Sequence, residues 1–181
     1  MSQYVISQHR CGAEKPYRIG LEIRGRPRMT TEKKKDKGRK VEVFIFRAAE
    51  RDSSNHSGRE FLLLRRPPDR DARWQPVTGS VEVGEGFAEG AIREVWEETG
   101  LLAHKSDLVG PVYEFQFENR GGRTVTEKVF GLLTGNFEAR LSHEHDTFEW
   151  LNFEEAVKRL HFDANKDGLK ALGAFLDKES K

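Results

Sequence analysis

The segment from Gly79 to Leu101, GSVEVGEGFAEGAIREVWEETGL, limits the possible folds of this chain more than any other part of its sequence. Its second half has apolar groups at i, i+3, i+4, i+7 and i+11, a spacing typical of a helix with one face against a core. Gly100 follows this stripe, at the position where a left-handed residue commonly ends a helix. The pattern predicts a loop and then a helix over Phe87–Thr99, with a buried face formed by Ala88, Ala91, Ile92, Val95 and the methyl group of Thr99.

Three glutamates accompany this apolar stripe. At about 100° per residue, Glu94 and Glu98 lie one turn apart at its rim. Glu97 is expected nearer to solvent, and Arg93 further outward still. Mg²⁺ prefers oxygen ligands and is often shared between one or two carboxylates and substrate phosphates. Many Glu-rich helices have only a solvated acidic face, but this spacing of acids, arginine and glycines favours a metal site that faces a polyphosphate.

The whole segment matches the pattern G-x5-E-x7-R-E-U-x-E-E-x-G-U, with U apolar, at every fixed position, and so resembles the Nudix family. This resemblance implies an α/β fold, a Nudix-type α/β/α sandwich with a mixed sheet and a loop–helix–loop metal site. It also implies Mg²⁺ or Mn²⁺ as cofactor and hydrolysis of a nucleoside diphosphate linked to another group. The implied roles are metal ligation by Glu94, Glu98, Glu97 and the Gly79 carbonyl, orientation of the glutamates by Arg93 through a pair with Glu85, and a structural role for Gly100.

The residues before the helix suggest a substrate class. WQPVTGSVEVGE, at positions 74–85, resembles WQ-x-VTGSVE-x-GE of the Nudix branch called dihydroneopterin triphosphate pyrophosphatases or dATP pyrophosphohydrolases. The preceding pair Arg65-Arg66 is similar to that branch too, and guanidinium groups at a strand end bind phosphate oxygens in bidentate fashion. The alternative for both arginines is a charged strand end without a role. The substrate-binding candidates are Arg65, Arg66, Thr78 and, more weakly, Lys40, while Trp74 either stacks on a ring or packs in the core.

A second segment, LSHEHDTFEWL at 141–151, resembles part of several Nudix branches, including pterin and dinucleoside polyphosphate hydrolases. There, the glutamate that matches Glu144 supplies a metal ligand or the general base. His143 and His145 flank it and are interpreted as neighbours that are structural or face the substrate. Asn165 is loosely similar to a polar residue of the pterin branch, and no role follows from that similarity.

The remaining pattern predicts further strands and helices in a mixed order. Strands are expected at 41–46, 61–64 and 148–151, and a hairpin at 108–118 and 124–134 around the turn NRGGR, while 74–83 leads into the predicted loop and helix. Helices are expected at 153–160 and 164–176.

We assign 41–181 to the Nudix domain and 1–40 to a basic extension, partly disordered, with 12 Lys and Arg against 4 Asp and Glu. This extension is interpreted either as a solvated linker, the favoured reading, or as an arm that attracts nucleic acid. Tyr17–Ile23 in it has part of a strand pattern.

The rest of the composition bears on location. No apolar run approaches the roughly 18 residues of a membrane helix, so no membrane partner is expected. The first residues lack the apolar segment of a signal peptide. Cys11 is the single cysteine, which excludes an internal disulfide. Together these features predict a cytoplasmic protein.

These observations give one leading function and several alternatives. The leading one is Mg²⁺-dependent hydrolysis of a nucleoside or pterin triphosphate to a monophosphate and pyrophosphate, with Glu97 or Glu144 accepting a proton from water. Hydrolysis of a dinucleoside polyphosphate is the second, and ADP-ribose or a nucleotide sugar the third. A module that senses a nucleotide, or binds nucleic acid through residues 1–40, is the alternative from another class.

Overall fold

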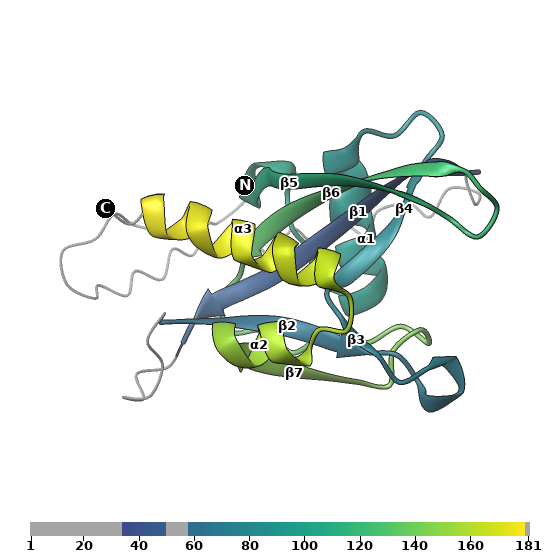
Figure 1. Cartoon of the computed structure of the whole chain (residues 1–181). Coiled ribbons are helices and arrows are strands. Elements are labelled where there is room, and N and C mark those ends of the chain that lie inside the picture. Colours follow the sequence, from purple (N-terminus) through teal and green to yellow (C-terminus); the bar gives the residue numbers. More distant parts are fainter. Residues whose placement is uncertain (1–33, 50–57, 180–181) are drawn as a thin grey trace, which may run out of the picture.

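A computed structural model describes residues 34–49 and 58–179. Those residues form a mixed seven-stranded sheet organised around the long strand β1, Lys35–Ala48 (Figure 1). On one edge, β1 pairs antiparallel with β4, Val77–Glu82, along its first half and with β2, Arg59–Arg65, at its end. On the other edge it pairs in parallel with β6, Thr124–Leu133. Strands β4 and β2 thus pair with successive parts of the same edge of β1.

The outer strands complete the sheet. Strand β6 forms an antiparallel hairpin with β5, Leu108–Glu118. Strand β2 also pairs with β3, Trp74–Gln75, and with β7, Thr147–Asn152. Two short 3₁₀ helices lie in the connections, at Pro68–Arg70 and Lys105–Asp107.

Three helices pack against this sheet. Helix α1, Phe87–Thr99, contacts β4 and β1, while α3, Asp163–Glu179, contacts β5 and β6 on the opposite face (Figure 1). Helix α2, Phe153–Arg159, lies against β2 and β7. The helices make the α/β/α layers that the sequence predicts. No described helix has the length and apolar character needed to cross a bilayer.

Alternation along β1 creates a hydrophobic core on each face, because successive strand residues point to opposite sides. Val41, Val43 and Ile45 face α1, where Ala91 and Val95 are buried. Phe44 and Phe46 face α3, where Leu169 and Leu172 are buried. Gly131 in β6 allows the close approach of α3, since a Cβ there would lie 2.6 Å from a methyl carbon of Leu172.

Most predicted elements are confirmed, and one differs in its bounds. Strand β1 begins at Lys35 instead of Val41, because Lys35 pairs with Glu82 and Lys40 with Ser80 across an irregularity in the ladder. The segment 74–83, to which the sequence assigns no element, contains β3 and β4 on either side of Pro76, which has no N–H for the ladder. The predicted strand at Tyr17–Ile23 and most of the basic extension lie outside the described residues.

Candidate active site

Helix α1 places the predicted glutamates as its period requires. Glu94 and Glu98 are each only 4% exposed, whereas Glu97 lies on the exposed side of the helix. The predicted apolar face is also present, with Ala91, Val95 and Thr99 buried and the other two residues of the stripe half-buried. Gly100 ends the helix in a left-handed conformation, φ 72°, and its N–H donates to the carbonyl of Trp96.

Arg93 does not point to solvent as the helical geometry predicts, because its long side chain folds back over the preceding loop. Its Nε and Nη2 donate to the two carboxylate oxygens of Glu85, each at 3.0 Å, and Nη2 also donates to the Ser80 carbonyl at 2.8 Å. Its Nη1 donates to Glu94 at 2.8 Å and Glu97 at 2.9 Å. The Arg93–Glu85 pair expected from the family resemblance is therefore present, and one guanidinium joins the loop to two acids of the helix.

Two opposing effects act on the pKa of Arg93. Desolvation disfavours the cation, but the hydrogen bond to Glu85 and the charges of Glu94 and Glu97 outweigh it, so the pKa of Arg93 is raised above its usual value. Glu85 is held in turn by the backbone N–H of Glu82, 2.8 Å from its Oε2. The loop before α1 is thus fixed by hydrogen bonds at both ends of the Arg93–Glu85 pair.

Gly79 in β4 lies directly against the carboxyl group of Glu94. A Cβ at this position would overlap that carboxyl group, so any larger residue would displace it. The Gly79 backbone and the Glu94 carboxylate consequently share one small space at the edge of β4. Carboxylate and backbone carbonyl oxygens are both suitable ligands for Mg²⁺.

The two buried glutamates are both held in a state that disfavours their negative charge. Burial raises the pKa of Glu94 to about 7, opposed by Arg93 and reinforced by the charges of Glu97 and Glu98. Burial also raises the pKa of Glu98, opposed by His145 and by the backbone of Thr78 and reinforced by Glu144. A divalent cation would stabilise both charged forms, because an opposite charge within a few ångströms offsets desolvation.

His145 is brought to Glu98 by the segment between β6 and β7. Its Nε2 lies 3.0 Å from Oε2 of Glu98, and the two side chains are 1% and 5% exposed. The backbone N–H of Ser142 donates to the Glu98 carbonyl at 3.1 Å, which joins this segment to the end of α1. Glu144 and His143 are exposed beside it. Glu144 therefore lies at the mouth of the site, close enough for its charge to act on Glu98.

Arg65 and Arg66 both have carboxylate partners. Arg65 donates from Nε and Nη2 to the two oxygens of Asp146, each at 2.9 Å, and this fork lowers the pKa of Asp146. The backbone N–H of Asp146 donates to the Arg65 carbonyl at 3.0 Å. Arg66 forms a longer ion pair, 3.5 Å, with Asp71. The structure thus places Arg65 beside Asp146, the neighbour in sequence of His145, which contacts Glu98.

The remaining sequence candidates lie in different surroundings. Thr78 accepts a hydrogen bond on Oγ1 from Gln75 at 3.3 Å, and its backbone contacts Glu98. Trp74 is half-buried against the α3-side core, under the guanidinium of Arg159 at 4.9 Å from the ring centroid. Lys40 faces away from the glutamates of α1, because it pairs with Glu127 at 3.9 Å on the α3 side of the sheet.

Three features of this region escape the sequence analysis. They are the His145–Glu98 contact, the Asp146 partner of Arg65, and a completely buried acid, Glu42, in β1. The first two join residues 47 and 81 positions apart, and no local spacing encodes such pairs. Glu42 has a weak signal, since it is the acid within the otherwise apolar run VEVFIF.

The donor set fits a magnesium site of the shared kind. Within residues 34–49 and 58–179, no three His, Cys, Asp or Glu side chains form a preassembled cluster. Mg²⁺ does not require one, because it commonly uses one or two carboxylates together with waters and substrate phosphates. Two observations fit a bound cation. The Glu94 carboxyl group lies directly against Gly79, and burial disfavours the negative charges of Glu94 and Glu98.

Comparison with known proteins identifies the family. A model of the NUDIX domain matches residues 36–172. The asymmetrical bis(5'-nucleosyl)-tetraphosphatase of Mus musculus is 35% identical over 136 residues, which cover 74% of this chain and 92% of that protein. The solved dihydroneopterin triphosphate pyrophosphohydrolase of E. coli is 25% identical, with a TM-score of 0.60 and coverage of 77% of this chain and 96% of that one.

This chain belongs to the Nudix hydrolase family. The predicted Nudix-type α/β/α sandwich and the resemblance read from residues 79–101 are thereby confirmed. The octanoyltransferase of Myxococcus xanthus is also similar, 38% identical over 117 residues, or 62% of this chain. That match spans only 32% of the octanoyltransferase, so this chain corresponds to about a third of it.

Proposed function

We propose that this protein hydrolyses a phosphoanhydride bond of a small nucleotide-like polyphosphate with the help of Mg²⁺ or Mn²⁺. The observation that carries the proposal is the pair of buried carboxylates, Glu94 and Glu98, one of them packed against Gly79. Burial disfavours the negative charge of both carboxylates. Such a pair is suited to a divalent cation that binds together with substrate phosphates.

The proposed ligands are Glu94 and Glu98, assisted by Glu97, the Gly79 carbonyl and Glu144. When bound, the cation would neutralise phosphate charge and make a water molecule more acidic. Arg93 keeps Glu94 and Glu97 in place, since it donates to both. A carboxylate at the mouth of the site, Glu144 or Glu97, accepts the proton as the water oxygen bonds to phosphorus. The bridging P–O bond on the opposite side breaks, and its electrons leave with the departing phosphate.

Arg65 is the proposed contact to the leaving phosphate, with Arg66 and Thr78 beside it. Its fork to Asp146 uses Nε and Nη2. Among the described residues no hydrogen bond is made by Nη1, which is therefore free to donate to a phosphate oxygen. Asp146 fixes the plane of the guanidinium, and a fixed plane favours bidentate or directed contacts with phosphate. Lys40 is left out of the proposed substrate contacts, because it pairs with Glu127 on the α3 side of the sheet.

Two substrate classes are supported by separate observations. The sequence WQPVTG and the E. coli structure support a pterin or nucleoside triphosphate, with a monophosphate and pyrophosphate as products. The Mus musculus relative, whose name states a bis(5'-nucleosyl)-tetraphosphatase, supports a dinucleoside polyphosphate equally well. Both classes present the same chemistry to the glutamates of α1, namely a chain of phosphates with a good leaving group.

A substrate panel distinguishes them. The purified protein with Mg²⁺ would be given dihydroneopterin triphosphate, the common NTPs and dNTPs, diadenosine tetraphosphate and ADP-ribose, and the products separated by chromatography. Pyrophosphate released fastest from the pterin compound or dATP supports the triphosphate class. Preferred cleavage of diadenosine tetraphosphate supports the dinucleoside class. Absence of turnover with both Mg²⁺ and Mn²⁺ contradicts the proposed hydrolysis and leaves nucleotide sensing as the function to pursue.

A further inference from the structure

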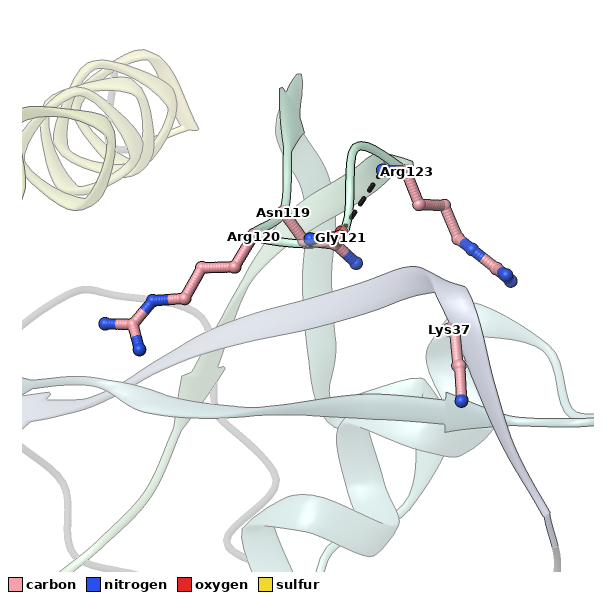
Figure 2. A pocket seen from close by; sticks show the side chains of 5 residues that line it. All are labelled: Lys37, Asn119, Arg120, Gly121 and Arg123. Carbon is pink, nitrogen blue, oxygen red and sulfur yellow. Dashed lines mark hydrogen bonds between the residues drawn. The ribbon is translucent and has the colours of Figure 1, made fainter.

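A pocket rich in positive charge lies at the turn between β5 and β6 (Figure 2). The turn contributes two arginines, which project from its opposite ends, and the first half of β1 contributes a lysine below them (Figure 2). All three cationic side chains belong to exposed residues. The lining residues are Lys37, Asn119, Arg120, Gly121 and Arg123.

The turn that presents the arginines has a defined conformation. Oδ1 of Asn119 accepts from the backbone N–H of Gly121 at 2.9 Å and of Arg123 at 3.2 Å. The Asn119 N–H donates to the Arg123 carbonyl at 3.0 Å, and Gly122 closes the turn with φ 69°. The backbone of the turn is therefore held in one conformation, so less backbone entropy is lost when a ligand binds.

These cations differ from most others of the described chain because they have no carboxylate partner. Within residues 34–49 and 58–179, no ion pair joins Lys37, Arg120 or Arg123 to an acid, whereas Arg47, Arg65, Arg93 and Arg159 all have one. Asp36, next to Lys37, is occupied by the N–H of Gly38 at 2.9 Å and by Arg39 at 3.7 Å. Glu118 is the nearest acid along β5, and it too forms no ion pair in the described part of the chain. Three neighbouring unpaired cations attract an anion.

The pocket is separate from the acids of α1. Strands β4 and β6 lie on opposite edges of β1, and the glutamates adjoin β4 whereas the pocket adjoins the β5–β6 turn. None of the five residues that line the pocket is among the proposed metal ligands or substrate contacts.

We propose that Lys37, Arg120 and Arg123 form a second anion site that binds the clustered phosphates of a small polyphosphate without a metal ion. Arginine and lysine are the side chains that recognise phosphate by charge-assisted hydrogen bonds. A nucleic-acid strand is the less suitable occupant, because surfaces for single strands combine cations with aromatic rings for base stacking. None of the five lining residues is aromatic.

Binding without metal is the property that tests this site. The full chain would be titrated with inorganic tripolyphosphate in EDTA at low ionic strength by calorimetry, because without cations the acidic active site repels the ligand. Saturable binding that weakens with added NaCl is expected. The double variant Arg120→Gln/Arg123→Gln is expected to lower the affinity at least tenfold. The charge-conserving variant Arg120→Lys/Arg123→Lys is expected to stay within about threefold of the wild type, since the attraction is mainly electrostatic.

A matched control removes the same charge elsewhere. Arg159→Gln/Lys170→Gln also deletes two exposed cations, both of them paired with carboxylates, and should change the affinity less than twofold. Circular dichroism and the melting temperature would verify that all variants fold. Equal binding by the Gln variant and this control overturns the proposal, as does an absence of metal-free binding. Tighter binding of a single-stranded oligonucleotide than of tripolyphosphate, lost in the Gln variant alone, also overturns it.

Discussion

Glu98 is the residue on which the proposed chemistry depends most. Its carboxyl group is buried, accepts from the backbone of Thr78 and lies 3.0 Å from Nε2 of His145. The Nδ1 atom of His145 is buried without a hydrogen-bond partner in the described chain, so Glu98 is the one polar side chain that contacts this ring there. The histidine thus orients the carboxylate, a role that the sequence leaves unresolved between structural and substrate-facing.

Replacement of Glu98 by Gln tests its assignment as a metal ligand. We expect turnover with Mg²⁺ to fall a hundredfold or more, because an amide lacks the negative charge that holds the cation. The matched control is Glu89→Gln in the same helix, where the exposed carboxylate pairs with Lys105. Initial rates of both variants would be compared, with circular dichroism to verify folding. Near-normal activity of the Glu98 variant would rule out the assignment.

Gly79→Ala tests the close contact between β4 and Glu94. The added Cβ would overlap the Glu94 carboxyl group and displace it. We expect Mn²⁺ affinity, measured by electron paramagnetic resonance, to fall at least tenfold and the free energy of unfolding to fall by about 1–3 kcal/mol. Gly38→Ala is the control, since its Cβ would meet its nearest neighbours at 3.6 and 3.7 Å. Unchanged Mn²⁺ binding in the Gly79 variant would show that the close contact between Gly79 and Glu94 is not needed for metal binding.

Among the elements, α3 and the sheet enclose an acid that the proposed reaction does not use. Glu42 of β1 is fully buried, and neither carboxylate oxygen has a hydrogen-bond partner of good geometry among the described residues. Burial, then the charge of Glu127, raises the pKa of Glu42 to about 8, while Asn165 and Lys40 oppose the shift. The folded state therefore prefers the protonated form.

This raised pKa makes the packing of α3 sensitive to pH. Because the folded-state pKa exceeds the ordinary value of 4.5, the stability contributed by protonated Glu42 is complete below that pH and lost as pH rises through about 8. We expect Glu42→Gln to melt roughly 5 °C above the wild type at pH 9, since about 1 kcal/mol shifts Tm by about 2–4 °C in a domain of this size. Thermal unfolding from pH 5 to 9 measures the difference.

The control for this pH effect is Glu154→Gln, an exposed acid at the start of α2. It should follow the wild-type curve throughout, because its charge is solvated in both states. Glu127 and Lys40 are present in both proteins, and their interactions with the Glu42 charge are part of the difference that the comparison measures. A Glu42 variant whose melting temperature falls with pH as steeply as the wild type would refute the assignment.

At the element scale, the sequence predicts α1 from its first to its last residue, because the apolar stripe and Gly100 are local signals. It does not predict the direction of Arg93, since a long side chain follows its hydrogen-bond partners and not the helical angle. It also leaves β3 and β4 unassigned, because these short strands depend on pairing with β2 and β1. Local pattern thus determines the elements better than the contacts between them.

For the whole molecule, a bound cation should link activity to stability. A ligand that binds only the folded state raises its stability by mass action. We expect about 10 mM Mg²⁺ to raise the melting temperature by a few °C, an increase reduced in Glu94→Gln and retained in Glu89→Gln. EDTA should abolish hydrolysis while the far-ultraviolet circular dichroism stays native, because Arg93 holds the loop and helix together without metal. Unfolding by EDTA, or an equal shift in both variants, would contradict this model.

The sequence alone determines the family, helix α1 and the identity of its acids, because these depend on residues within one loop and one helix whose spacing is set by helical geometry. The tertiary structure alone brings His145 to Glu98, Asp146 to Arg65, and Lys37 to the β5–β6 turn. It also buries Glu42 beneath α3. These contacts join distant segments through sheet pairing and packing, and such pairing is decided by the whole fold and not by any local pattern of residues.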